Sequence, residues 1–184
     1  MILPIYAYGQ PVLKKQAKAI DADYKDLEKL IADMWETMYN ASGVGLAAPQ
    51  VGISIRLFVV DTVQIQEKGE ESKGIKKVFI NAEILDRTGD LWSYEEGCLS
   101  IPNINGDVER ESNVVIRYVD ENFNEQTESY DGMSARVIMH EYDHIEGILF
   151  TERISPLRRK LIQRKLDSIR GGKANASYRL KYIV

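Results

Sequence analysis

Cysteine is almost absent from this sequence, since Cys98 is the only one among 184 residues. A lone thiol excludes any intramolecular disulfide, the usual staple of small secreted domains. The first residues, Met1 to Gly9, also lack the basic start and the apolar stretch of a secretory signal. We therefore expect a cytoplasmic protein in a reducing compartment.

Long apolar runs and a strong excess of one charge are missing as well. The longest apolar stretches, such as Leu57 to Val60, fall far short of the roughly 20 residues that a membrane-spanning helix requires. The formal net charge of −4 argues against a protein that coats nucleic acid. We expect no membrane partner and no sequence-specific nucleic-acid partner.

Internal repeats and low-complexity linkers are not found either, which favours a single domain over residues 1–184. The chain is 44% hydrophobic, and a domain of this length buries roughly two-thirds of its surface on folding. A helix over 156–170 and a tail over 171–184 are expected to be appended at its C-terminal end.

Hydrophobic periodicity predicts the individual elements. It predicts an amphipathic N-terminal helix over 23–41, a mostly apolar and therefore buried helix over 133–146, and a third helix over 156–170. β-Branched and aromatic runs predict strands over 55–61, 76–81, 91–95, 113–119 and 125–130. Short strands in succession favour antiparallel pairing. The expected fold is α+β, with antiparallel strands packed around the central helix.

The only two histidines lie in the segment His140-Glu141-Tyr142-Asp143-His144 of the central helix. A spacing of four places both imidazoles on one helix face, where they can bind the same metal ion. Glu141 follows the first histidine and can reach a water at that ion. Because an apolar helix has no packing reason to bury two imidazoles, metal binding is favoured over a role in the core.

A catalytic metal site of this kind needs a third protein ligand. No third histidine exists, so the candidates are a carboxylate and Cys98, which lies just after a predicted strand. Beside the histidine pair, ligation is favoured for Cys98 over the usual role of a small buried apolar residue. The set Cys98, His140 and His144 suits one divalent ion per chain, such as iron(II), zinc, cobalt or nickel.

Three segments of the chain together resemble one known family. They are Gly43-Val44-Gly45-Leu46-Ala47-Ala48-Pro49-Gln50, Glu96-Gly97-Cys98-Leu99-Ser100 and the histidine segment, in this order. In sequence and spacing they resemble peptide deformylase, which removes the N-formyl group from nascent bacterial and organellar proteins. The resemblance runs from about Gln10 to about Phe150. It implies a metal-dependent hydrolase that releases formate from N-terminal formyl-methionine.

The resemblance also implies roles for residues of these motifs. The three metal ligands would be those already named, and the ion would commonly be iron(II). Glu141 would act as general base and then general acid. The side-chain amide of Gln50 and the backbone N–H of Leu99 would donate hydrogen bonds to the oxyanion that forms from the formyl oxygen.

Substrate binding is expected on two sides of the metal. The resemblance implies that the backbone of Val44 and Gly45 pairs with an extended peptide, which ignores its side chains. Met133 and Val137 share the helix face of the first histidine and are expected to line the methionine pocket. Arg136 falls on the same face, where the family is mostly apolar, and is expected to turn its charge toward solvent.

Further charged residues surround the predicted ligands. Glu96, two residues before Cys98, is expected to support the metal site from behind, with Arg110 as its partner. For Asp143 two interpretations stay open, since it can orient another group or solvate the helix.

Three other functions compete at this stage. A metallopeptidase that cleaves internal peptide bonds shares the His-Glu-x-x-His helix, but it would leave Gln50 and Cys98 without a role. A cysteine hydrolase would use Cys98 as its nucleophile and remain active without metal. A non-catalytic domain with a structural metal would need neither Glu141 nor Gln50.

The C-terminal helix is strongly basic in a chain that is otherwise acidic. Residues 156–173 carry seven basic side chains against one acid, a net charge of +6. The general interpretation is a solvated helix that docks on the domain through its apolar residues, Leu157, Leu161, Leu166 and Ile169. The family resemblance favours a second role, contact with RNA phosphates of the ribosome from which formyl-Met nascent peptides emerge.

Overall fold

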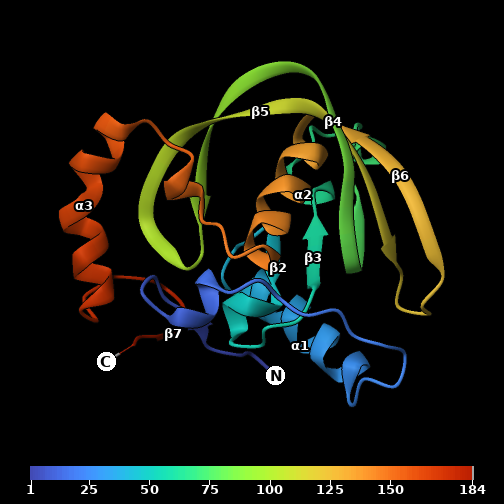
Figure 1. The fold of residues 1–184 in the computed structure, drawn as a ribbon, viewed down its shortest axis with the longest axis horizontal. Helices are drawn as coiled ribbons and strands as arrows, with labels where there is room; N and C mark the ends of the chain where they lie inside the picture. Colours follow the sequence, from blue (N-terminus) through green and yellow to red (C-terminus); the bar gives the residue numbers. More distant parts are fainter. Residues whose placement is uncertain (184) are drawn as a thin grey trace.

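The computed structural model describes residues 1–183, and its central feature is a five-stranded antiparallel sheet (Figure 1). The strands lie in the order β2 (Gly45–Ala47), β3 (Leu57–Asp61), β4 (Lys76–Cys98), β5 (Ile101–Val119) and β6 (Glu125–Asp131). A separate parallel pair joins β1 (Ile5–Tyr6) to β7 (Leu180–Lys181).

The longer helices are α1 (Leu27–Asn40), α2 (Gly132–Ile145) and α3 (Pro156–Arg170). Short 3-10 helices span Pro11–Lys14, Ala48–Val51, Val63–Ile65, Glu71–Lys73 and Phe150–Glu152. The mixture of helices with an antiparallel sheet confirms the predicted α+β class. None of the helices in the described part of the chain has the length and hydropathy that a membrane crossing requires.

Strand β3 is buried on both faces because a helix covers each side of the sheet. Alternate side chains of a strand point to opposite faces. Leu57 and Val59 accordingly pack in the apolar cluster of α1, whereas Phe58 and Val60 pack in the cluster of α2. An uninterrupted apolar run is what such a doubly covered strand requires.

The β4–β5 hairpin is much longer than the sequence predicted. Strands predicted over 76–81, 91–95 and 113–119 are parts of two continuous strands that pair from Ile80 opposite Val119 to Cys98 opposite Ile101, with several register shifts. The inward positions of β5 include Gly106 and Arg110 among apolar residues. These two break the hydrophobic alternation, so the pattern underestimated the strand.

Helix α2 lies inside the curve of the β4–β5 hairpin (Figure 1). Its residues Ala135, Ile138 and Met139 are almost fully buried. Because the hairpin bends around the helix, residues near the end of β4 can reach the ligand face of α2. The fold thus brings the second and third sequence motifs together.

Helix α3 stands at the edge of the molecule and docks through a face that differs from the predicted one (Figure 1). Leu157 and Leu161 were expected to dock, but they are 70% and 67% exposed. Ile162, Leu166 and Ile169 are buried instead, at a spacing of four and three that forms one helical stripe. The prediction was wrong for the two leucines because the helix presents the adjacent stripe to the body.

Candidate metal centre and active site

Two adjacent pieces of structure supply the three predicted ligands. Cys98 ends β4, and His140 and His144 lie one turn apart on α2. One donor atom from each lies within 4.8 Å of the other two, and Cys98 Sγ is 3.3 Å from His144 Nε2. An ion bonded to such atoms at 2.0–2.3 Å holds them about 3.5 Å apart, so the spacing fits a shared metal.

His140 is oriented by Glu96, whose Oε1 lies 2.9 Å from the Nδ1 atom of the ring. This contact leaves Nε2 free to face the ligand cluster, as in many carboxylate-histidine-metal arrangements. Arg110 donates to both oxygens of Glu96 at 2.7 and 2.9 Å, so the predicted pairing is present. Burial alone would raise the pKa of Glu96, but hydrogen bonds from Arg110 and His140 outweigh it and hold that pKa well below its usual value.

Arg136 does not turn toward solvent, and that expectation was wrong. The side chain is 2% exposed and donates to Glu96 Oε2 at 2.8 Å. It also donates to the carbonyls of Val108 and Trp92, and its guanidinium lies 4.4 Å from the centre of the Trp92 ring. A buried carboxylate and two strand carbonyls inside the hairpin outweigh the hydration of a helix arginine.

Asp143 extends this buried network and has an orienting role. It accepts from Arg110 at 3.0 Å and from Arg153 at 2.6 and 2.7 Å. Arg110 therefore bridges two carboxylates, one behind each end of the histidine segment. Buried charges paired in this way fix the position of α2 against β4 and β5.

Glu141 is buried next to the glycine-rich segment. A side chain at Gly45 would place its Cβ 2.5 Å from Glu141 Oε1, so only glycine allows this approach. Burial raises the pKa of Glu141 to about 7. A carboxyl that changes protonation near neutral pH suits a group that accepts a proton and later returns it.

Three buried side-chain polar atoms have no hydrogen-bond partner among residues 1–183, and all three lie at this site. They are Arg136 Nε, Glu141 Oε2 and His144 Nδ1. Burial lowers the pKa of His144 well below its usual value, which keeps the imidazole neutral as a metal ligand requires. Unsatisfied buried groups are rare in folded proteins, so their clustering here makes this region the candidate functional site.

Gln50 reaches the cluster from the short helix that follows β2. Its Oε1 accepts from the backbone N–H of Ala47 at 3.0 Å, which fixes the amide orientation. Its Nε2 then points at Cys98 Sγ, 3.4 Å away, and at Ser100 Oγ, 3.2 Å away. An uncharged donor is thus held beside the ligands.

A cavity of about 750 Å³ opens onto these groups. The predicted substrate residues Val44, Gly45, Met133 and Val137 all line it, as do Gln50, Cys98, Leu99, His140 and Glu141. Of the predicted site residues, His144 alone is not in this lining.

The sequence analysis missed the C-terminal tail as part of this cavity. Residues Asn175 to Tyr178 line it, and Tyr178 donates from its hydroxyl to the carbonyl of Leu99 at 2.7 Å. A signal was present, because Ala174, Tyr178 and Leu180 belong to an alternation of inward residues with exposed ones that is typical of an extended strand.

Comparison with known proteins agrees with this geometry. The family model described as polypeptide deformylase matches residues 2–160. The peptide deformylase of Flavobacterium psychrophilum is 54% identical over 190 residues, which cover 100% of this chain and 98% of that protein. The enzyme of the same name from Christiangramia forsetii is 53% identical and covers 99% of this chain and 96% of its own.

Solved structures give the same result. A peptide deformylase from Legionella pneumophila superposes with a TM-score of 0.80 at 38% identity, covering 91% of this chain and 95% of that one. The Thermotoga maritima peptide deformylase gives 0.74 at 41% identity, covering 85% and 99%. Since the family model spans most of the chain and the relatives cover nearly all of it, the chain belongs to the peptide deformylase family.

Proposed function

We propose that this enzyme hydrolyses the formamide bond of N-terminal formyl-methionine on nascent polypeptides, using Cys98, His140 and His144 as ligands of one divalent metal ion. The observation that carries the proposal is that these three donors lie within 4.8 Å of one another, with Cys98 and His140 lining the same cavity as Glu141. Hydrolysis joins the oxygen of one water to the formyl carbon and breaks the bond from that carbon to nitrogen. Formate and a free amine are the products.

The bound ion would polarise the formyl oxygen and lower the pKa of water toward neutrality. Iron(II) is the proposed metal because of the family resemblance, and zinc, nickel and cobalt also suit one thiolate and two imidazoles. Glu96 supports the site by holding His140 through Nδ1. Arg110 in turn keeps Glu96 ionised.

Glu141 carries the proton in this proposal. With a pKa of about 7 it is partly ionised at neutral pH, so it can accept a proton from the attacking water. It then delivers that proton to the amine nitrogen as the carbon–nitrogen bond breaks. Its contact with Gly45 places it beside the strand on which we propose that the peptide lies.

Charge that develops on the formyl oxygen needs donors that are already in place. Gln50 Nε2 is one, since Ala47 fixes the orientation of its amide. The backbone N–H of Leu99 is the second proposed donor, one residue after the thiolate ligand. Each such donor typically contributes about 10²- to 10³-fold to the rate.

The sheet order supports the proposed mode of peptide binding. β2 is an edge strand, paired with β3 on one side only. Its other edge can therefore accept an extended peptide through the backbone of Val44 and Gly45. Met133 and Val137 would then receive the methionine side chain, and later side chains of the peptide would point away without selection.

Formate release from a formyl-Met peptide by freshly purified, anaerobically handled protein tests the proposal, with the acetyl-Met peptide as substrate control. We expect formate from the first peptide, no hydrolysis of the second, and loss of activity on chelation that iron(II) restores. Activity that survives complete metal removal would support a cysteine hydrolase. Cleavage of internal peptide bonds would support a different metallopeptidase.

A matched pair of variants on α2 tests the role of Glu141. We expect Glu141→Ala to retain metal and lose about 10²- to 10⁴-fold in kcat. Glu146→Ala removes a carboxylate from the end of the same helix, where it pairs with Arg56 at 2.6 Å, and should keep most of the activity. Equal kcat values in the two variants would contradict the assignment.

We also propose that α3 docks on ribosomal RNA and that the enzyme works in the cytoplasm, where nascent chains emerge. The basic side chains Arg159, Lys160 and Arg164 are exposed on this helix. Leu157 and Leu161 are exposed beside them, which gives the helix an apolar contact surface as well as charge. RNA phosphates match the charge, and such contacts weaken with salt.

A further inference from the structure

The segment that carries both a proposed metal ligand and a proposed oxyanion donor is a very short turn. Cys98 pairs with Ile101 across the β4–β5 hairpin, so only Leu99 and Ser100 connect the two strands. The position of Cys98 Sγ and the direction of the Leu99 N–H both depend on the backbone of this turn. Its conformation therefore bears directly on the reacting groups.

The two carbonyls of the turn are held from outside the hairpin. Tyr178 Oη donates to the Leu99 carbonyl at 2.7 Å, and the backbone N–H of Tyr8 donates to the Ser100 carbonyl at 2.8 Å. These donors come from opposite ends of the chain. The turn is thus held by one hydrogen bond from the N-terminal segment and one from the C-terminal tail.

The tail that carries Tyr178 is itself fixed. Strand β7, which begins two residues later, pairs in parallel with β1. Gln10 Nε2 donates to the Tyr182 carbonyl at 2.7 Å, and the backbone N–H of Ile5 donates to the Arg179 carbonyl at 2.9 Å. The phenol of Tyr178 is therefore held at the turn by the anchored strand that follows it.

The carbonyl that Tyr178 holds belongs to the central peptide of the turn. Common turn types differ mainly by rotation of this central peptide, which changes ψ of the residue before it. Here that residue is Leu99, whose own N–H is the proposed oxyanion donor. A hydrogen bond that fixes the carbonyl therefore restricts the backbone of Leu99.

We infer that Tyr178 is a positioning residue for deformylation: through the Leu99 carbonyl, its hydroxyl fixes the turn that holds Cys98 at the proposed metal site and directs the Leu99 N–H toward the formyl group. The inference rests on the proposed function for the role of that N–H. Tyr178 also lines the cavity, so a simple role as a wall for the substrate is the competing explanation. The two roles differ in their effects on kcat and KM.

Tyr178→Phe tests the inference in the metal-loaded enzyme, because it removes one oxygen and keeps the ring. We expect kcat for a formyl-Met peptide to fall about tenfold with KM within about twofold, since a displaced donor weakens the transition state more than substrate binding. Amide hydrogen exchange of residues 98–101 should rise about tenfold. Metal content should remain that of the wild-type enzyme.

Tyr182→Phe is the matched control, since it removes a hydroxyl from the same tail that bonds Ala174 instead of the turn. It should leave kcat and the exchange of residues 98–101 unchanged. Thermal unfolding of both variants measures what each hydroxyl contributes to stability.

Several results would overturn the inference. They are an unchanged kcat or unchanged exchange in Tyr178→Phe, a raised KM with normal kcat, and equal losses in the two variants. The exchange measurement does not depend on deformylation. If the wild-type enzyme released no formate, the proposed function would fail while exchange still reported whether Tyr178 holds the turn.

Discussion

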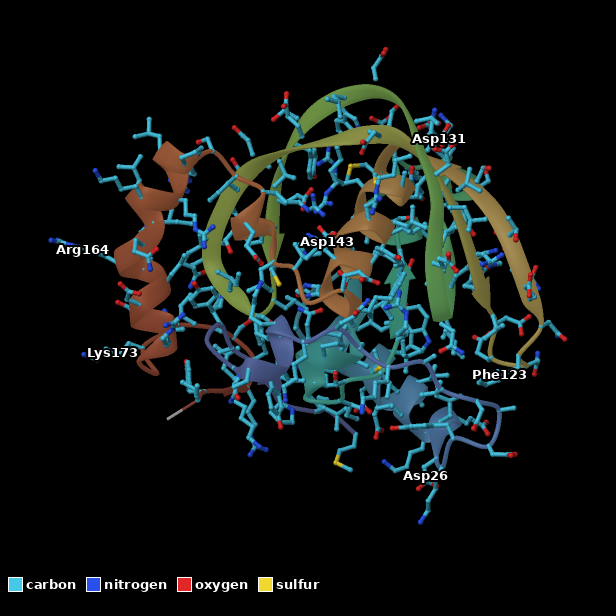
Figure 2. All side chains as sticks on the ribbon, viewed as in Figure 1. Asp26, Phe123, Asp131, Asp143, Arg164 and Lys173 are labelled. Carbon is cyan, nitrogen blue, oxygen red and sulfur yellow. The ribbon has the colours of Figure 1, made fainter. Side chains whose placement is uncertain are left out.

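Around α2 the charged side chains are buried and paired, whereas along α3 they extend into solvent. Glu96, Arg110, Arg136 and Asp143 are each at most 5% exposed, and each accepts or donates at least one charged hydrogen bond. In Figure 2, Asp143 lies deep inside the molecule. These groups have lost their water and depend on one another.

Most charged side chains of α3 remain exposed to solvent. Figure 2 shows Arg164 and Lys173 pointing outward from the end of the molecule that α3 forms. Here the buried stripe of Ile162, Leu166 and Ile169 anchors the helix. The contrast shows that similar residue types can fix a catalytic site or remain available for a partner, depending on burial.

Removal of Glu96 from the buried network should cause the largest loss in the free energy of unfolding. Glu96→Ala leaves Arg110 and Arg136 buried beside each other without their shared carboxylate, which we expect to lower the free energy of unfolding by about 3–5 kcal/mol. Urea unfolding measures this loss, and elemental analysis should show reduced metal because His140 loses its orienting partner. A loss below about 1 kcal/mol would mean that the network reorganises and is not held as described.

Replacement of Arg136 should have an intermediate effect. Arg136→Met places an apolar side chain of similar length there and removes the guanidinium hydrogen bonds to the carbonyls of Val108 and Trp92. Glu96 still has Arg110 and His140, so we expect a loss of about 2 kcal/mol by urea unfolding. If Arg136 pointed to solvent as its charge suggested, the substitution would change stability by less than about 0.5 kcal/mol.

Glu128 on β6 is intermediate between the buried charges around α2 and the exposed charges of α3, because its side chain is 27% exposed. Burial would raise the pKa of Glu128, but hydrogen bonds from Lys77 and Tyr118 overcome it and lower that pKa below the usual value. The pairing therefore stabilises the fold above pH 4.5 and is lost as pH falls through the lowered pKa.

For Glu128→Gln we expect a loss of about 1 kcal/mol at pH 7, measured by urea unfolding. Since the wild-type carboxylate becomes protonated in acid, the difference between the two proteins should shrink toward pH 3. A difference that stays constant from pH 7 to pH 3 would show that charge at Glu128 does not contribute.

The contrast also explains what the sequence could predict. His140, Glu141 and His144 could be predicted because ligand spacing on a helix is local, and Cys98 and Gln50 followed from short motifs. The buried position of Arg136 could not be predicted, since it depends on Glu96, forty residues earlier in the chain. Helical periodicity placed Arg136 on the ligand face, and its charge alone favoured solvent.

The predicted strand lengths were wrong for a related physical reason. Gly106 occupies an inward position of β5 because a Cβ there would lie 2.7 Å from the Ile154 side chain, and Arg110 does so because it pairs with Glu96. Both residues interrupt the apolar alternation. For the tail, the sequence analysis left 171–184 without a role, although Tyr178 bonds Leu99. The alternation of the tail indicates an extended segment, but no local signature shows which backbone group it contacts.

Charge reversal on α3 should have the smallest effect on folding. Arg158 is left unchanged because its guanidinium donates to the Asn105 carbonyl at 2.7 Å. The combined variant Arg159→Glu, Lys160→Glu, Arg164→Glu alters only exposed positions. We expect its unfolding free energy to differ from the wild type by less than about 0.5 kcal/mol per site.

The same variant should have a large effect on ribosome binding. Reversal of three charges turns attraction for RNA phosphates into repulsion, so co-sedimentation with ribosomes should fall by at least tenfold at low salt and depend less on salt. A control with the same change in net charge reverses Lys15, Lys25 and Lys68, which are exposed away from α3. Turnover of a short formyl-Met peptide should stay normal in both variants. If both lost binding equally, net charge would be responsible, and if neither did, α3 would have only its structural role.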